Sequence, residues 1–203
     1  MRKVSEAWSA IDEWLERRVP ASDPARHAPA TRAGIAAAEQ ALGLKFPADL
    51  VESLLCHDGQ PRYCGDFPGY PLLPLEDIVS TRQMLMEVAA SVDEDDEGIG
   101  RDDADDWWWH EQWLPIADLD GSVQLLDCRP GPGYGRLGSR PKDDVAHFGP
   151  GWGWPDFATY LDAVATAMTQ GGDFDGMVPH LTDEGELRWA YPDEDPELTL
   201  VPR

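Results

Sequence analysis

Hydrophobic residues recur at helical spacing at the start of the chain. Val4, Trp8, Ile11 and Leu15 lie at positions i, i+4, i+7 and i+11, so they share one stripe of a helix that we expect to end at Pro20. Three prolines between positions 20 and 29 then predict a linker loop, because proline cannot continue a helix.

Two further helices are predicted before the pattern changes at Gly59. Thr31 can cap the first and Gly43 can end it; its inward residues are Ile35, Ala38 and Leu42. Pro47 suits the first turn of the second helix, and Gly59 is its predicted end. The inward residues of this helix are Leu50, Val51, Leu54 and Leu55.

The middle of the chain predicts a hairpin. A short strand is expected at 72–75, and the helical spacing that follows it stops at the acidic residues after Ser91. Two apolar runs, 113–117 and 123–128, flank a five-residue loop that contains Gly121. Antiparallel pairing is the simplest arrangement of two such runs.

The last third predicts one helix between strands. A loop rich in Gly and Pro at 129–144 precedes an expected strand at 145–148, and a helix over 157–168 should stop at Gly171. Alternating apolar residues after the turn at 183–185 predict a terminal hairpin. Early helices, clustered strands and one later helix predict an α+β fold with a mostly antiparallel sheet, and the lack of βαβ alternation argues against a doubly wound nucleotide-binding fold.

The net charge of the chain limits the kinds of molecule that it is expected to bind. The chain of 203 residues has 16 Lys and Arg against 39 Asp and Glu, a formal net charge of −23. Nucleic acid and anionic membranes attract cationic surfaces, so we expect this acidic chain to bind neither of them. We expect it to bind a basic protein instead. Residues 93–106 carry −8 and residues 173–203 carry −7. We expect one domain over 1–203, with a core at about 4–170, an acidic insert at 93–112 and an acidic extension at 172–203.

Neither a secretory signal nor an apolar run long enough for a membrane helix is found, and the three cysteines do not form a disulfide framework. We therefore expect a cytoplasmic protein with reduced thiols.

The matches to catalytic motifs are weak. The glycines at 131–135 lack the spacing and the lysine of a phosphate-binding loop, and no serine lies in a G-x-S-x-G motif.

Two groups of residues superficially resemble metal sites. The stretch 93–98 begins like a calcium loop, but Ala104 stands where a bidentate glutamate belongs, so a solvated acidic loop is favoured. Cys56, His57 and Cys64 could bind zinc, but paired C-x-x-C motifs are missing, which favours a packed cysteine beside a helix end. We expect neither a metal nor a cofactor.

Three consecutive tryptophans, Trp107, Trp108 and Trp109, follow the acidic stretch. Three adjacent indoles cannot all face one side of a strand or helix, so at least one should reach a surface, a loop contact or a partner. The structural alternative, which we favour, is that these indoles anchor the acidic loop to the sheet.

An ordered set of motifs resembles the SUKH superfamily, which includes yeast cell-wall assembly regulators and many bacterial toxin-immunity proteins. The motifs are Trp8-x-x-Ile11-Asp12, Leu42-Gly43-Leu44-x-Phe46-Pro47, His57-Asp58-Gly59, Trp113-x-Pro115-Ile116, Asp120-Gly121 with Asp127, and Phe157-x-x-Tyr160-Leu161. The match spans about 8–168. The family more often has Glu in place of Asp12 and Asn in place of Asp58, and neither the segment 93–112 nor the tail from 172 belongs to its pattern.

The resemblance implies a non-enzymatic α+β protein-binding domain. It implies structural roles for Trp8, Leu42, Leu54 and Ile116 in the core, for Gly43 and Gly59 at helix ends and for Pro47 at a helix start. Bacterial relatives bind and block a cognate toxin, and the fungal branch acts as a regulatory scaffold.

Our first hypothesis is an immunity-type protein that covers a basic toxin surface. Five aspartates would steer the partner: Asp95, Asp96, Asp102, Asp103 and Asp106. Trp107, Trp108 and Trp109 would then anchor it, because exposed aromatics supply the desolvated contacts that hold an interface. The alternatives are an intracellular regulatory scaffold and, third, a metal-dependent enzyme.

Overall fold

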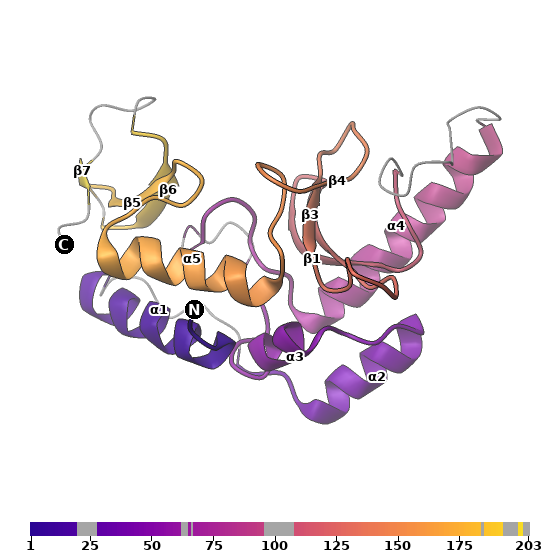
Figure 1. Cartoon of the computed structure of the whole chain (residues 1–203), viewed down its shortest axis with the longest axis horizontal. Helices are drawn as coiled ribbons and strands as arrows, with labels where there is room; N and C mark the ends of the chain where they lie inside the picture. Colours follow the sequence, from indigo (N-terminus) through magenta and orange to yellow (C-terminus); the bar gives the residue numbers. More distant parts are fainter. Residues whose placement is uncertain are drawn as a thin grey trace.

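The described part of the chain forms five helices and seven strands (Figure 1). The structure is a computed structural model that describes residues 1–19, 28–61, 65, 67–95, 108–183, 185–192 and 199–200, with the backbone alone for 92–95 and 199–200. The elements are α1 (Val4–Arg18), α2 (Arg32–Leu42), α3 (Ala48–Leu54), α4 (Leu75–Asp95), β1 (Trp113–Leu119), β2 (Ser122–Asp127), β3 (Leu137–Arg140), β4 (His147–Phe148), α5 (Phe157–Gln170), β5 (Val178–Leu181), β6 (Leu187–Ala190) and β7 (Thr199–Leu200). The predicted α+β fold is confirmed.

Strands β1 to β4 form one antiparallel sheet in that order, and a second antiparallel sheet has the order β6-β5-β7. Both predicted hairpins are confirmed. The β1–β2 hairpin closes on Asp120-Gly121, whose φ angles of 52° and 91° are those a two-residue primed turn requires. In Figure 1 the second sheet lies beyond the C-terminal end of α5, apart from the first sheet.

Helix ends follow the local signals in most places. Thr31 caps α2 by accepting a hydrogen bond from the Gly34 amide at 3.0 Å, and Gly43 ends the helix with a φ of 64°. Gly171 ends α5 in the same way, with a φ of 70°. These predictions are confirmed, because capping depends on residues that are close in the sequence.

Two predicted boundaries are wrong. α3 ends at Leu54, so Gly59 does not stop it; a Cβ at Gly59 would instead lie 2.2 Å from the backbone nitrogen of Pro74. The expected strand at 72–75 is reduced to a single bridge from Leu72 to Ala117, because α4 already begins at Leu75.

The strand β3 lies inside the segment that we predicted to be a loop. Leu137 to Arg140 pair with β2, and a Cβ at Gly138 would lie 2.6 Å from the Phe148 ring. The glycine that suggested a loop therefore allows β4 to approach β3 closely. β4 itself is shorter than expected, with only His147 and Phe148 in the strand.

The first sheet packs against two hydrophobic clusters. The larger cluster joins α1, α2, α3 and α5 to the sheet, and the side chains expected in the core, those of Trp8, Leu42, Leu54 and Ile116, are all buried in it. The smaller cluster, which we call the second cluster, consists of Leu85, Trp109, Trp113, Val123, Leu125 and Ala146. α4 contributes Ile78 to the first and Leu85 to the second, so this helix joins the two.

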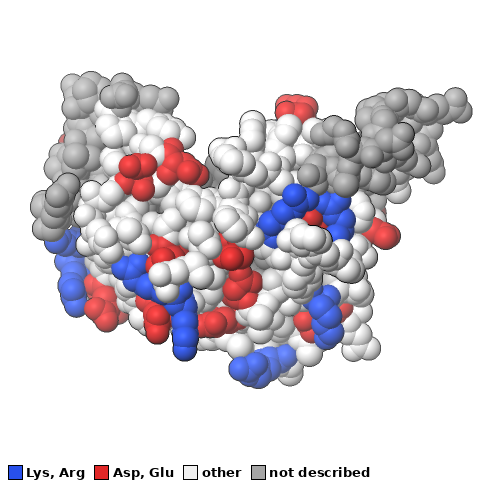
Figure 2. Space-filling model, in the orientation of Figure 1, with Lys and Arg blue, Asp and Glu red and all other residues white. Residues whose placement is uncertain are grey.

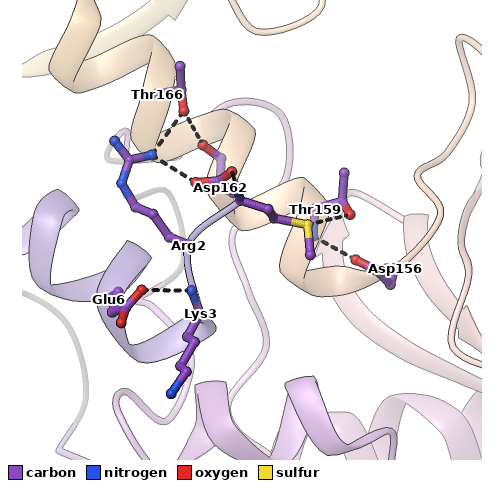
Figure 3. Close-up of polar contacts among 8 residues, drawn as sticks. Arg2, Lys3, Glu6, Asp156, Thr159, Asp162 and Thr166 are labelled. Atoms are coloured by element: carbon purple, nitrogen blue, oxygen red, sulfur yellow. Dashed lines mark hydrogen bonds and ion pairs between the residues drawn. The ribbon is translucent and has the colours of Figure 1, made fainter.

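Polar contacts fix the start of the chain against α5 (Figure 3). The Arg2 guanidinium donates to Asp162 Oδ1 at 2.8 Å and to the Thr166 hydroxyl at 3.0 Å. These bonds reinforce the packing of α1 along α5, which Figure 1 shows side by side. Within the described ranges, no helix is both long and apolar enough to span a bilayer.

Candidate functional site

The acidic insert rejoins the fold through residues 108–113, which we call the insert base. Trp109 is 4% exposed and meets the Trp113 ring edge to face, at 5.9 Å between centroids and 88° between planes. Trp108 is half-buried against the second cluster, and the Arg140 guanidinium lies 4.7 Å from the centre of its ring. Both indoles therefore hold the insert base to the sheet.

Arg82 ties the insert base to α4. Its Nε donates to the Trp113 carbonyl at 3.3 Å, and its guanidinium also donates to the Glu111 carbonyl. Burial lowers the pKa of the Arg82 guanidinium, although it stays charged at neutral pH because an arginine titrates far above that range. The helix that leads into the acidic insert and the segment that leads out of it are thus joined by one buried side chain.

The structure describes only part of the predicted partner-binding set. Asp95 ends α4, and its side chain is not described. Asp96, Asp102, Asp103, Asp106 and Trp107 lie outside the described residues, so their role stays a prediction. Trp108 and Trp109 contact the sheet, as the structural alternative expected, and the buried Trp109 ring is closed to a partner in this conformation.

Two arginines that the sequence analysis did not single out surround a buried carboxylate next to the insert base. Asp127 is 2% exposed and accepts from Arg129 at 2.9 and 2.7 Å and from Arg136 at 3.1 Å. Burial favours the neutral carboxyl, but the bonds from Arg129 and Arg136 outweigh it, so the pKa of Asp127 lies below its ordinary value. The Arg129 guanidinium also lies 5.5 Å from the centre of the Trp113 ring, and the Arg136 guanidinium lies 4.0 Å from the centre of the Phe148 ring. The only signal for this cluster in the sequence was that Asp127 belongs to the family-like motifs.

Asp12 of α1, Ser53 of α3 and His57, which follows α3, are the residue types of a hydrolase triad, but they form structural contacts. His57 Nε2 lies 3.0 Å from Asp12 Oδ2, and the Ser53 hydroxyl accepts a hydrogen bond from Trp8 Nε1 at 2.9 Å. Ser53 is only 4% exposed. A nucleophilic serine must be reachable by substrate and lie beside its base, so this arrangement is better suited to joining α1 to α3.

Asp58, the next residue in the same motif, caps a helix that is distant in sequence. Its Oδ1 accepts a hydrogen bond from the Leu75 amide at 2.7 Å, at the start of α4. Asn, which the resemblance leads one to expect at this position, has a carbonyl oxygen that could accept the same bond. The substitution of Asp for Asn in the motif is therefore compatible with the same cap.

The thiols and acids do not form a metal centre in the part of the chain that the structure describes. No group of three or more His, Cys, Asp or Glu side chains there could hold an ion. Cys56 and Cys128 are free thiols, and burial raises the pKa of both, that of Cys128 to about 12, which makes them poor nucleophiles. Cys64 and residues 96–98 of the calcium-like stretch lie outside the described residues, and only the backbone of 93–95 is described.

Comparison with known proteins gives one family and two related fungal proteins. A model described as the SMI1 / KNR4 family (SUKH-1) matches residues 29–163. A "Cell wall biosynthesis/cell cycle regulator smi1" of Schizosaccharomyces pombe is 27% identical over 217 residues, which cover 98% of this chain and 39% of that protein. A "KNR4/SMI1 homolog" of Kluyveromyces lactis is 33% identical over 93 residues, 43% of this chain and 17% of that protein. The chain therefore spans less than half the length of either relative.

Proposed function

Because the chain belongs to the SMI1/KNR4 family (SUKH-1), we propose that it is a non-enzymatic protein-binding domain whose partner is a basic protein. The proposal rests chiefly on one observation, the attachment of the acidic insert. Residues 93–106 carry a charge of −8, and they connect α4 to the insert base, which Arg82 and Trp109 hold in place. Both ends of this charged segment are therefore joined to the described fold.

Charge of this kind acts mainly on the rate and orientation of encounter. A concentrated negative segment attracts a cationic surface over about one Debye length and raises the association rate, while buried contacts determine how long the complex lasts. The five aspartates of the predicted set supply the steering in this proposal. Trp107 and the exposed part of Trp108 supply the contacts that exclude water.

We assign the partner to the class of toxins, so that the domain would neutralise a basic toxin domain by covering its surface, as the resemblance to immunity proteins suggests. The names of the two relatives favour a second candidate, a regulatory domain that binds proteins of cell-wall biosynthesis or the cell cycle. Both candidates need the same acidic surface and differ only in the partner.

The absence of catalysis is part of the proposal. The described residues whose side chains could take part in catalysis form structural hydrogen bonds instead. The Ser53 hydroxyl accepts a bond from the Trp8 indole N–H, and the Asp127 carboxylate accepts bonds from Arg129 and Arg136. The raised pKa of Cys128 keeps its thiol protonated at neutral pH.

Affinity capture from the cells that produce the protein tests the proposal. The bait is the full chain, and the comparison is a variant with Asp95, Asp96, Asp102, Asp103 and Asp106 changed to Lys. A matched control reverses five exposed acids elsewhere, Glu16, Glu87, Asp143, Asp183 and Glu186, and so changes the net charge equally. We expect mass spectrometry to identify a basic protein that the wild type and the control retain and that the first variant loses.

The identity of the retained protein decides between the two candidates. A captured protein that kills cells when it is expressed alone, and that is harmless when this chain is expressed with it, supports the immunity function. A retained protein of cell-wall synthesis or the cell cycle supports the regulatory function. Retention of acidic proteins only, or equal retention by all three baits, contradicts the proposal.

A further inference from the structure

A small cleft lies where the first sheet faces the segment that leads into β5. It is lined by Gln124 of β2, residues 137–139 of β3, the loop 151–154 and Asp175, and its volume is about 70 Å³. Figure 2 shows the surface hollowed between these two parts of the molecule, with Asp and Glu side chains on the left wall. The cleft is separate from the insert base.

A rigid turn holds Asp175 at one wall. Phe174 and Met177 exchange two backbone hydrogen bonds of 2.8 and 2.9 Å around Asp175 and Gly176, whose φ angles are 49° and 83°. These are the features of a two-residue primed turn, for which Asp-Gly is a favoured sequence. Phe174 is buried and stacks on Trp154 at 5.2 Å, so the turn that carries the Asp175 carboxylate is fixed to the core.

An exposed indole also lines the cleft. Trp152 is 47% exposed, although its ring lies 4.6 Å from that of His147. The loop that carries it is folded by a bond from the Gly153 amide to the Gly149 carbonyl at 2.9 Å, and the Leu137 amide ties it to β3 through the Trp154 carbonyl, also at 2.9 Å. A large aromatic surface is thus held in the open beside a carboxylate.

One polar atom of a residue that lines the cleft has no hydrogen-bond partner among the described residues. This atom is Oε1 of Gln124. The hydroxyl of Tyr160 also has no partner among the described residues; Tyr160 does not line the cleft, but its buried ring packs edge to face on the lining residue Trp154 at 6.2 Å. Burial raises the pKa of the Tyr160 hydroxyl, and the charge of Asp175 raises it further. Burial also raises the pKa of Asp175, as does the charge of Asp173. A cation beside Asp175 would offset the loss of hydration of its carboxylate.

Size and chemistry select one kind of occupant. Pockets for small organic ligands usually measure about 300 Å³ or more, so this cleft has room for little more than the end of one side chain. Its described lining residues include a carboxylate, an amide oxygen and two indoles, and no Lys, Arg or His is among them. A planar guanidinium can bind a carboxylate and stack on an indole at the same time, which an ammonium ion does less well.

We propose that this cleft receives an arginine side chain of the partner protein, with the guanidinium bound to Asp175 and stacked on Trp152. The proposal rests on the proposed function, because it gives the basic partner a specific point of contact. The acidic insert would then steer the partner, while the cleft would set the position of one arginine.

Nuclear magnetic resonance of the full-length, ¹⁵N-labelled chain tests the site without the partner. The probe is N-acetyl-arginine-N-methylamide, and its citrulline analogue, which has nearly the same shape but no charge, is the control. The arginine probe should cause saturable shifts of the Trp152 indole N–H, assigned with the Trp152→Phe variant, and of the Gly176 amide. Trp152→Ala and Asp175→Asn should each weaken binding by roughly fivefold or more, whereas Asp183→Asn removes an exposed charge outside the cleft and should not.

Shifts that do not saturate, equal shifts with citrulline, or equal affinity in Asp175→Asn would overturn the site. Thermal melting of each variant shows whether its fold is intact, and Asp175→Asn keeps the turn sequence favourable because Asn-Gly also suits a primed turn.

Affinity capture with the same variants separates this inference from the proposed function. The partner should be retained by Asp183→Asn and depleted with Asp175→Asn and with Trp152→Ala. Full retention by the two cleft variants would overturn the cleft contact while the proposed function stands. Saturable arginine binding without any captured basic protein would support the site and contradict the proposed function.

Discussion

At the residue scale, Asp127 shows how a buried charge is kept in a strongly acidic protein. Its carboxylate is 2% exposed and receives hydrogen bonds from Arg129 and Arg136. Their combined effect exceeds the cost of burial and lowers the pKa of Asp127 in the folded state. Folding therefore favours the ionised carboxylate, and the stability that it contributes depends on pH.

Changing Asp127 to Asn should destabilise the fold by about 3 kcal/mol at pH 7, because two partly buried guanidinium groups lose their counter-charge. The lowered pKa means that Asp127 contributes its full stability above its unfolded pKa of about 3.9. The contribution is lost as the pH falls through the lower, folded value. Urea unfolding between pH 7 and pH 2 should show a smaller loss of stability below pH 4 in the variant than in the wild type, and parallel curves would contradict this account.

Gly59 and Gly43 form a matched pair for testing backbone constraint. Both have positive φ, 70° and 64°, but a Cβ at Gly59 would meet the Pro74 backbone at 2.2 Å, whereas a Cβ at Gly43 has nothing within 4 Å. Gly43→Ala should cost about 1 kcal/mol from φ alone. Gly59→Ala should cost roughly 3 kcal/mol or more, because the backbone around it must also move. Equal costs in chemical denaturation would mean that the contact with residues 73 and 74 is unimportant.

These two glycines also show what can be inferred from local sequence. Gly43 ends a helix, as predicted, because this role depends only on the turn that precedes it. Gly59 looks the same in the sequence, yet glycine is needed there because the backbone of a segment 14 residues away approaches it closely. A contact of this kind depends on the folded chain and has no local pattern.

At the element scale, α4 is the helix that connects the large core to the insert. Its start is capped by Asp58 and its middle is joined to the insert base by Arg82. The acidic residues after Ser91 predicted the end of this helix, because the helix dipole opposes negative charge near its C-terminus. α4 ends at Asp95, within that acidic stretch.

Removing the Asp58 cap should loosen the beginning of α4. Asp58→Ala should cost about 1 kcal/mol and speed hydrogen exchange at the amides of residues 75–78, because the Leu75 amide loses its acceptor. Asp58→Asn keeps a carbonyl oxygen at the same place and should retain most of the protection. Faster exchange in the Asn variant than in the Ala variant would contradict a capping role.

The hairpins and β3 differ in how far sequence could predict them. The β1–β2 hairpin follows from two apolar runs and one Asp-Gly turn, all within a few residues. β3 contains Gly138 and Ser139 and looked like a loop, because its pairing depends on Phe148 covering the glycine. The family-like motifs could place the core elements, but not the packing that turned this loop into a strand.

At the scale of the whole molecule, the charge of −23 is unevenly distributed. The segments 93–106 and 173–203 together carry −15 of it, and the family model ends at residue 163, before the second segment begins. The acidic insert was evident from the sequence because it is continuous. The cleft was not, because its lining comes from four separate segments that only the fold brings together.

The central claim, that acidic residues of the insert steer a basic partner, is tested most directly by association kinetics. The association rate constant of the captured partner is measured by stopped flow from about 20 to 300 mM salt, a range over which the Debye length falls several-fold. Three chains are compared: the wild type, the five-aspartate Lys variant and the control with five exposed acids reversed elsewhere.

We expect the wild-type rate to fall at least about tenfold across this range, as it does for steered complexes. The five-aspartate variant should associate at least about tenfold more slowly at low salt and depend less on salt, and the control should lie closer to the wild type because its charges are not on the insert. Equal rates for all three chains at low salt would contradict the claim that the insert steers the partner.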